Sequence, residues 1–167
     1  ENDGERAANM KRWYVINTRP KKEFQVERLL EEGGFEVYNP KYKLDGAVRP
    51  FFTGYEFVLF EYPEQYRLIK YTRGVKILVG NENGPIPIQG EIIHEIRKRE
   101  VDGYIELEKY GREPSLGDEV QVMEGPLKGL KGLFKKELSG KDRAIILLNY
   151  VSYQGQLIIE KKRLKKI

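Results

Sequence analysis

Residues 51–58 decide the fold, and they read Phe-Phe-Thr-Gly-Tyr-Glu-Phe-Val. Aromatic and β-branched residues favour a pleated surface, so we predict that the chain is extended from Tyr55 to Glu61. Trp13 to Asn17 has the same character, and Thr18-Arg19-Pro20 provides a turn at its end. Two such strands predict a small sheet in the first half of the chain.

Helices are predicted between these strands and after them. Residues 21–32 place three apolar side chains on one face, namely Val26, Leu29 and Leu30. Gly33-Gly34 then ends this helix. The other elements expected in this part of the chain are extended segments at 36–39 and 76–79 and helices at 64–70 and 91–99. Strands interleaved with helices on one small sheet predict an α/β sandwich.

The last third of the chain has a different pattern. Val120 and Val122 alternate with other residues, while Gly125-Pro126 and Ser139-Gly140 have the composition of turns. The expected strands lie at 132–138, 144–151 and 156–159. Short strands separated by turns, in about 54 residues, predict a small β-barrel.

Charged residues divide the chain into blocks. Residues 10–99 hold 16 basic and 12 acidic side chains, residues 100–113 hold 2 and 5, and residues 114–167 hold 11 and 6. We therefore expect a tag or disordered tail at 1–9, a first domain at 10–102, an acidic linker at 103–113 and a second domain at 114–167. Gly103 and Gly111 in the linker predict that the two domains move independently.

The composition argues against most catalytic chemistry. The 167 residues contain no cysteine and a single histidine, His94, to which we assign no role. Thiol nucleophiles and metal sites made of cysteines or several histidines are therefore excluded. The carboxylates show no paired spacing that indicates hydrolysis. We expect a protein that is not an enzyme and that uses neither a metal nor a cofactor.

Apolar runs are short throughout the sequence. The longest, such as Phe57 to Phe60 and Ala144 to Leu148, fall far below the roughly 20 residues that span a bilayer. We expect a soluble, cytoplasmic monomer without a membrane partner.

Two parts of the sequence resemble a known family. Residues 117–132, from Gly-Asp-Glu-Val to Leu-Lys-Gly, resemble a KOW motif. Four earlier segments follow the order and spacing of a NusG-type N-terminal (NGN) domain. They are Trp13-Tyr14-Val15, residues 51–58, Thr72-Arg73-Gly74-Val75 and Ile86-Pro87-Ile88. On these segments the chain is identified as a member of the NusG/Spt5 family of transcription elongation factors.

One departure from the common family pattern indicates a specialised member. The usual Phe-Pro-Gly-Tyr is here Phe52-Thr53-Gly54-Tyr55. The chain is most similar in this respect to specialised paralogs of the RfaH and LoaP type, which act on chosen operons. The Thr-Arg-Gly-Val segment and the short first block add to this similarity.

The resemblance implies both a fold and a function. The implied fold is α+β, an NGN-like α/β sandwich followed by a small SH3-like β-barrel, the KOW domain. The implied function is transcription elongation and processive antitermination, in which the protein binds RNA polymerase across its clamp helices and gate loop and suppresses pausing and termination. A DNA element or an RNA hairpin would recruit it to selected operons. The alternative is a ribosome-associated or translation-related RNA-binding protein that uses the KOW domain alone.

The resemblance also assigns roles to residues. The expected polymerase-binding residues are Trp13, Tyr14, Phe52, Tyr55, Phe57, Gln65, Tyr66 and Arg67. Phe52 and Tyr55 are the expected anchors, because aromatic rings dominate interface hot spots. The expected nucleic-acid-binding residues are Arg19, Lys21, Lys22, Lys41, Lys43, Arg49 and Arg73. Their ligand is either non-template DNA or an RNA hairpin, and both alternatives stay open.

The KOW domain is expected to recruit a second partner, either ribosomal protein S10 or the termination factor Rho. The expected partner-binding residues are Leu127, Lys128, Leu130 and Phe134. In RfaH this region can form a helical hairpin that masks the polymerase site. The turn at Ser139-Gly140 and the β-rich run from Ala144 to Leu148 predict a stable barrel in this chain instead.

Overall fold

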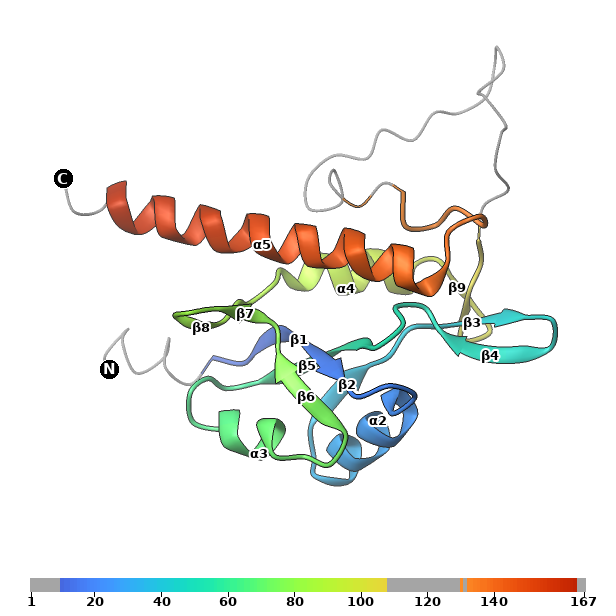
Figure 1. Ribbon diagram of the computed structural model, residues 1–167, viewed down its shortest axis with the longest axis horizontal. Helices are drawn as coiled ribbons and strands as arrows, with labels where there is room; N and C mark the ends of the chain where they lie inside the picture. Colours follow the sequence, from blue (N-terminus) through green and yellow to red (C-terminus); the bar gives the residue numbers. More distant parts are fainter. Residues whose placement is uncertain (1–9, 108–129, 131, 165–167) are drawn as a thin grey trace, which may run out of the picture.

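The chain folds around a small antiparallel sheet. The structure is a computed structural model, and it describes residues 10–107, 130 and 132–164 (Figure 1). Its four-stranded sheet has the order β2-β5-β1-β6. These strands are β1 (Arg12–Thr18), β2 (Glu36–Tyr38), β5 (Tyr55–Phe60) and β6 (Val75–Leu78). The described residues also form three hairpins, which pair β3 (Lys41–Leu44) with β4 (Ala47–Pro50), β7 (Gly80–Asn81) with β8 (Gly84–Pro85), and β9 (Glu100–Val101) with β10 (Tyr104–Ile105).

Helices cover both faces of the sheet. They are α2 (Glu23–Glu32), α3 (Tyr66–Lys70), α4 (Gly90–Arg97) and α5 (Gly140–Leu164). Figure 1 shows α4 and α5 on one side of the sheet and α2 and α3 on the other. Within the described ranges, no helix is both long enough and apolar enough to cross a membrane.

The pairing of β1 with β5 separates two hydrophobic layers. Val15 lies opposite Phe57, and Tyr14 lies opposite Val58. Because successive side chains of a strand point to opposite faces, Val15 and Phe57 join the layer beneath α4 and α5. Tyr14 and Val58 join the layer beneath α2 and α3, with Val26 of α2. The sheet is therefore buried on both sides.

The α/β architecture predicted for the first block is confirmed. The expected strand at Trp13 to Asn17 is β1, the expected helix at 21–32 is α2, and the expected strand from Tyr55 is β5. The expected boundary at residue 102 falls inside the β9–β10 hairpin, and Ile105 is buried in the layer beneath α5. Residues 103–107 thus belong to the folded first block and not to a linker.

The strands predicted for the end of the chain are wrong in this structure. Residues 144–151 and 156–159 form parts of one helix, α5, and residues 132–138 contain turns where a strand was expected. Leu147, Tyr150 and Val151 recur at helical spacing and are buried in the layer beneath α5. Burial against the sheet overrides the β preference of the Ile- and Val-containing sequence. Residues 114–129 of the predicted barrel lie outside the described residues.

The Ser139-Gly140 pair, predicted as a turn between strands, begins α5. The Asp142 backbone N–H donates a hydrogen bond to Ser139 Oγ at 3.1 Å. The Ser139 backbone N–H donates to Asp142 Oδ2 at 3.0 Å in return. These reciprocal bonds satisfy two backbone donors at the helix N-terminus, as in a capping box. They also lower the pKa of the Asp142 carboxyl, because the bonds favour its charged form.

Two glycines of α5 allow the helix to lie close to the first block. Gly140 contacts Thr53, whose backbone N–H donates a hydrogen bond to Gly140 O at 3.2 Å. A Cβ atom at Gly155 would lie only 2.7 Å from Ile86 Cδ1. The absence of a side chain at both positions lets α5 lie along the sheet layer over much of its length. We call this arrangement the docked state of α5.

We predict that Gly155→Leu displaces α5, because a leucine side chain has no room beside Ile86. Overpacking of this kind costs about 1–3 kcal/mol. Thermal melts followed by helical circular dichroism should show part of the helical signal lost at a lower temperature than in the wild-type protein. Ser152→Leu, on an exposed position of the same helix, is the control and should melt like wild type. Equal melting of the Gly155→Leu variant would contradict the close packing.

Candidate functional site

An aromatic face lies beneath α5. Phe51, Phe52 and Phe57 are all fully buried there. Phe52 packs edge-on against both of the others, with ring centroids 4.9 Å from Phe51 and 5.7 Å from Phe57. Trp13 and Tyr55 are partly buried and pack against the same cluster. We call these five residues the aromatic face.

The end of the chain covers this face. Phe134 stacks on Phe51 with ring centroids 5.9 Å apart. Leu147, Tyr150 and Val151 of α5 belong to the same buried cluster as Phe51. The other described residues of this region that join the cluster are Leu130, Leu133, Ile146 and Ile158. Residue 130 and residues from 132–158 of the same chain thus share the buried cluster of the aromatic face.

Arg143 fastens the beginning of α5 to the first block. Its side chain is fully buried, and its Nε donates a hydrogen bond to Phe51 O at 2.7 Å. Its Nη1 donates to Leu138 O, also at 2.7 Å. The guanidinium carbon lies 4.5 Å from the ring centroid of Phe51 and 4.6 Å from that of Tyr42. Backbone carbonyls and aromatic faces therefore surround this cation.

The predicted polymerase-binding residues fall into three places. Trp13, Phe52, Tyr55 and Phe57 lie together in the aromatic face. Tyr14 lies on the opposite layer, where its ring packs 4.5 Å from that of Phe60. Gln65, Tyr66 and Arg67 lie at the beginning of α3. Only the first group forms one continuous cluster.

The three predicted residues near α3 have different surroundings. Gln65 Oε1 accepts a hydrogen bond from the Glu61 backbone N–H at 2.9 Å, so its side chain holds the preceding turn. Tyr66 is partly buried and packs edge-on against Tyr62 at 5.5 Å. Arg67 is exposed, and its guanidinium lies 6.0 Å from the ring centroid of Tyr71. Arg67 is therefore the most accessible of the three.

Four of the predicted nucleic-acid-binding residues lie side by side. The Arg19 backbone N–H donates a hydrogen bond to Gly74 O at 2.8 Å, which joins the turn before α2 to the turn that contains Arg73. Gly74 also lies against Lys22, since a Cβ there would be 3.3 Å from Lys22 Cβ. The side chains of this cation group, Arg19, Lys21, Lys22 and Arg73, are exposed. Lys21 has φ 63°, an uncommon backbone conformation for a residue with a side chain.

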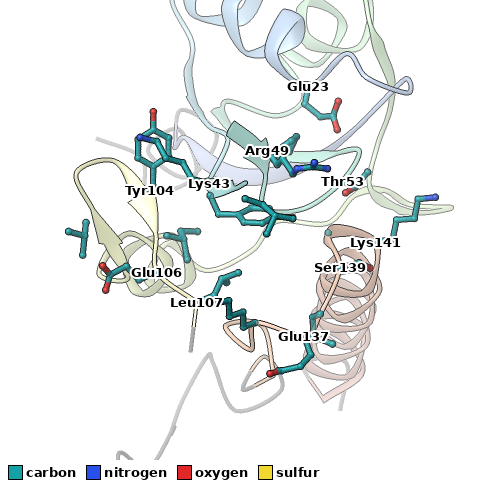
Figure 2. Close-up of a pocket in the computed structure, with 18 of the residues that line it drawn as sticks. Glu23, Lys43, Arg49, Thr53, Tyr104, Glu106, Leu107, Glu137, Ser139 and Lys141 are labelled. Carbon is teal, nitrogen blue, oxygen red and sulfur yellow. The ribbon is translucent and has the colours of Figure 1, made fainter. Parts of the chain in front are cut away.

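The other three predicted cations lie on the β3–β4 hairpin. Lys41 is engaged in an ion pair with Glu27 at 2.8 Å. Lys43 lies over the ring of Tyr104 at 4.3 Å. Figure 2 shows Lys43 and Arg49 at a hollow of about 1030 Å³ between the hairpins and the beginning of α5. Lys136 and Lys141 also line this hollow. Four carboxylates balance the four cations, namely Glu23, Asp102, Glu106 and Glu137.

The predicted partner-binding residues are not available as a surface. Leu130 and Phe134 are buried in the cluster over the aromatic face. Leu127 and Lys128 lie outside the described residues. The expected exposed docking surface at Leu130 and Phe134 is therefore wrong for the docked state.

A buried carboxyl lies on the opposite layer of the sheet. Glu56 is fully buried, and neither of its carboxyl oxygens has a hydrogen-bond partner in the described part of the protein. Burial raises the pKa of Glu56 to about 9, and the carboxylates of Glu27 and Glu23 add to the shift while Lys41 opposes it. Glu56 is therefore held protonated at neutral pH. Its alternation with Tyr55 and Phe57 places it on the layer of α2, but nothing in the sequence predicted its environment.

Metal-ligating side chains do not cluster in the described part of the chain. No group of three or more His, Asp or Glu side chains among them is arranged to hold a metal ion. His94 lies on α4, away from any such cluster. What the described residues offer is an aromatic face beneath α5 and an exposed cation group.

Comparison with known proteins identifies the first block. Residues 11–97, which run from β1 to the end of α4, match the family described as transcription termination factor NusG. The chain belongs to the NusG family. This family consists of transcription factors that are not enzymes. Helix α5 lies outside the matched residues.

A solved structure provides a second comparison for this NusG family chain. It comes from a study of domain interaction in Thermotoga maritima NusG, with 22% sequence identity and a TM-score of 0.43. The alignment covers 50% of this chain and 54% of that chain, so this chain spans about half the length of that relative. A comparison with curated protein sequences finds no match.

We predict that Glu56→Gln removes a pH dependence from the stability of this NusG family chain. Because the folded-state pKa of Glu56 is raised from 4.5 to about 9, its protonated form stabilises the fold at low pH. That stability is lost as the pH rises through about 9. The wild-type free energy of unfolding should fall relative to the variant by at most about 1.4 kcal/mol per pH unit.

Denaturant unfolding at a series of pH values between about 5 and 9 measures this effect. Glu64→Gln, at an exposed position, is the control and should follow the wild-type profile. Parallel profiles for wild type and Glu56→Gln would show that the buried carboxyl does not retain its proton.

Proposed function

We propose that this chain is a transcription elongation factor that binds RNA polymerase through its aromatic face once α5 has left it. The observation that carries the proposal is that Leu147, Tyr150 and Val151 of α5 share one buried cluster with the aromatic face. Family membership supports a role in transcription, and the clamp helices of the polymerase are the proposed partner. In the docked state the same surface is occupied by the chain's own residues.

The chemistry of the aromatic face suits a protein partner. Three phenylalanines, a tryptophan and a tyrosine form one continuous patch with a large apolar area. Such side chains provide much contact area with few rotatable bonds, which is why they dominate interface hot spots. A patch of this size rarely stays exposed to water, so it requires either α5 or a partner as a cover.

Competition between α5 and the polymerase would make binding conditional. The apparent affinity of a site falls with the fraction of molecules in which it is open. If α5 leaves about one molecule in a hundred open, the apparent Kd is about a hundred times the intrinsic one. A recruiting signal that displaces α5 would then restrict the factor to selected operons.

The cation group supplies the proposed nucleic-acid contact. Arg19, Lys21, Lys22 and Arg73 make no ion pair in the part of the chain that the structure describes. Clustered lysine and arginine side chains bind phosphates and release counterions. A DNA or RNA element held there would place the factor beside the polymerase, where it would suppress pausing and termination.

Release of α5 should strengthen polymerase binding. Leu147→Glu places a charge in the buried cluster and should undock α5, so the variant should bind purified RNA polymerase at least about tenfold more tightly than wild type. Ile145→Glu is the matched control, because Ile145 is on the same helix and is 59% exposed. Binding to immobilised polymerase measures both variants.

Two further measurements sharpen this test. Tyr55→Ala added to Leu147→Glu should abolish the gain in binding. In single-round transcription through an intrinsic terminator, the variants should rank in read-through as they rank in polymerase binding. Gly155→Leu serves as a second undocking variant if Leu147→Glu aggregates. Equal binding by wild type and both undocking variants would refute a covered polymerase site.

A further inference from the structure

A groove lies between the β7–β8 hairpin and the second half of α5. Figure 1 shows the hairpin alongside this helix, and the groove has a volume of about 360 Å³. Its walls are the hairpin with Pro87, the beginning of β1, Tyr62, and one side of α5 from Gly155 to Lys162. We call it the hairpin groove. Small-molecule sites occupy about 300–1,000 Å³, so this groove has room for a compact ligand.

Side chains with hydrogen-bond donors line the hairpin groove. Asn81 Oδ1 accepts a hydrogen bond from the Asn83 backbone N–H at 2.9 Å, which fixes the orientation of the side-chain amide. Asn81 Nδ2 faces α5, where a Cβ atom at Gly155 would lie 3.7 Å from it. The Tyr62 hydroxyl lies over Gly84, where a Cβ atom would be only 2.7 Å from it. An amide and a phenol are therefore placed at this groove.

The charge of the hairpin groove is positive. Among the described residues that line it, the ionised side chains are Arg12 and Lys162, and none is a carboxylate. Glu61, Glu82 and Glu160 are next in sequence to lining residues but do not line the groove themselves. Neither cation makes an ion pair in the part of the chain that the structure describes. Both charges are available to an anionic ligand.

Apolar side chains also line the hairpin groove. Ile86 is buried in the layer beneath α5, and Ile158 packs against the same layer. The Tyr14 ring lies 6.2 Å from that of Tyr62. Burial raises the pKa of Tyr14 and the nearby Arg12 opposes the rise, so a cation and an aromatic ring lie close together here. The groove thus combines buried apolar side chains with exposed cations.

The hairpin groove requires the docked state of α5. Gly155, Ile158 and Lys162 belong to α5, whereas the remaining walls belong to the first block. In the proposed undocked state these walls would separate. A ligand that binds only one of two states stabilises that state by mass action. A ligand in this groove therefore holds α5 on the aromatic face.

We propose that the hairpin groove binds a small amphipathic anion, in which an apolar ring or chain carries a carboxylate or a phosphate. The apolar body packs against Ile86 and Ile158, and the anionic group pairs with Arg12 and Lys162. Asn81 supplies a further donor. Charge-assisted hydrogen bonds orient a ligand of this kind, while burial of its apolar body supplies affinity.

The bound anion would regulate polymerase binding without contacting the aromatic face. At about ten times its Kd, it raises the ratio of docked to undocked molecules about elevenfold. The apparent Kd for polymerase rises by about the same factor where the docked state dominates. This regulation rests on the proposed function, whereas ligand binding in the groove does not.

Amide NMR spectra of the full chain, titrated with three naphthalene derivatives, test the binding site. Naphthoate and naphthyl phosphate carry the anionic group, and naphthamide is the neutral control. At least one anion should shift the signals of Gly84 and Gly155, which line the groove, and leave that of Gly46 unchanged. Naphthamide should bind at least about fivefold more weakly. The tighter anion identifies carboxylate or phosphate as the preferred group.

Paired substitutions test the two cations. Arg12→Gln combined with Lys162→Gln should weaken binding of the anion by about tenfold, because two charge-assisted contacts are lost. Lys11→Gln combined with Lys161→Gln is the matched control. It removes the same charge from adjacent positions that do not line the groove, and it should bind the anion like wild type.

Undocking tests the contribution of α5. Leu147→Glu lies outside the groove and should abolish binding of the anion, whereas Ile145→Glu should bind it like wild type. The anion should weaken polymerase binding by the wild-type protein and leave polymerase binding by Leu147→Glu unchanged.

Three results would overturn the groove as a site for an anion. They are no shift at Gly84 and Gly155 with either anion, equal affinity for naphthamide, and equal affinities of the two paired variants. Anion binding that leaves polymerase binding unchanged would overturn only the regulation. Absence of polymerase binding by wild type and undocked variants alike would overturn the proposed function, while the NMR titration would still decide the groove.

Discussion

The buried guanidinium of Arg143 strongly affects the free energy with which α5 docks on the first block. Removing a charged group from water costs free energy, and Arg143 forms no ion pair among the described residues, although the nearby Asp142 carboxylate favours its charged form. Two backbone carbonyls and the rings of Phe51 and Tyr42 compensate in part. Burial lowers the pKa of Arg143, because it disfavours the charged form of the side chain. The free energy of docking therefore combines this unfavourable desolvation of Arg143 with the favourable burial of the apolar side chains Leu147, Tyr150 and Val151.

A balance of this kind suits the proposed role of α5 as a removable cover. The aromatic face gains from any apolar partner, and α5 provides one without requiring a second molecule. In the proposed undocked state, Arg143 would regain its hydration while Phe51 and Phe52 would lose their cover. The first effect favours release and the second opposes it, so a partner that covers the aromatic face shifts the equilibrium. The helix α3 lies on the opposite side of the sheet from α5.

Sequence patterns predicted the first block because its local and tertiary preferences agree. β1 and β5 are rich in aromatic and β-branched residues and are also buried in the sheet, and α2 has an apolar stripe that meets that sheet. The end of the chain shows the opposite situation. Its isoleucines and valines favour strands, but α5 forms because it can bury one side on the aromatic face. The Ser139-x-x-Asp142 capping pattern was the one local signal for this helix, and it was interpreted as a turn.

The candidate site likewise has features that the sequence could predict and features that it could not. Successive side chains of a strand face opposite ways, so Trp13 and Tyr14 could not both join the aromatic face, and Tyr14 lies on the other layer. The contacts of Arg143 and the burial of Glu56 depend on segments distant in sequence, so composition and spacing could not reveal them.

The central claim is that α5 and the polymerase compete for the aromatic face. Hydrogen–deuterium exchange of the full chain, free and bound to RNA polymerase, tests it most directly. The account predicts that the amides of α5 are protected in the free protein and exchange rapidly in the complex, while β5 stays protected in both. Protection of α5 that persists in the polymerase complex would contradict it.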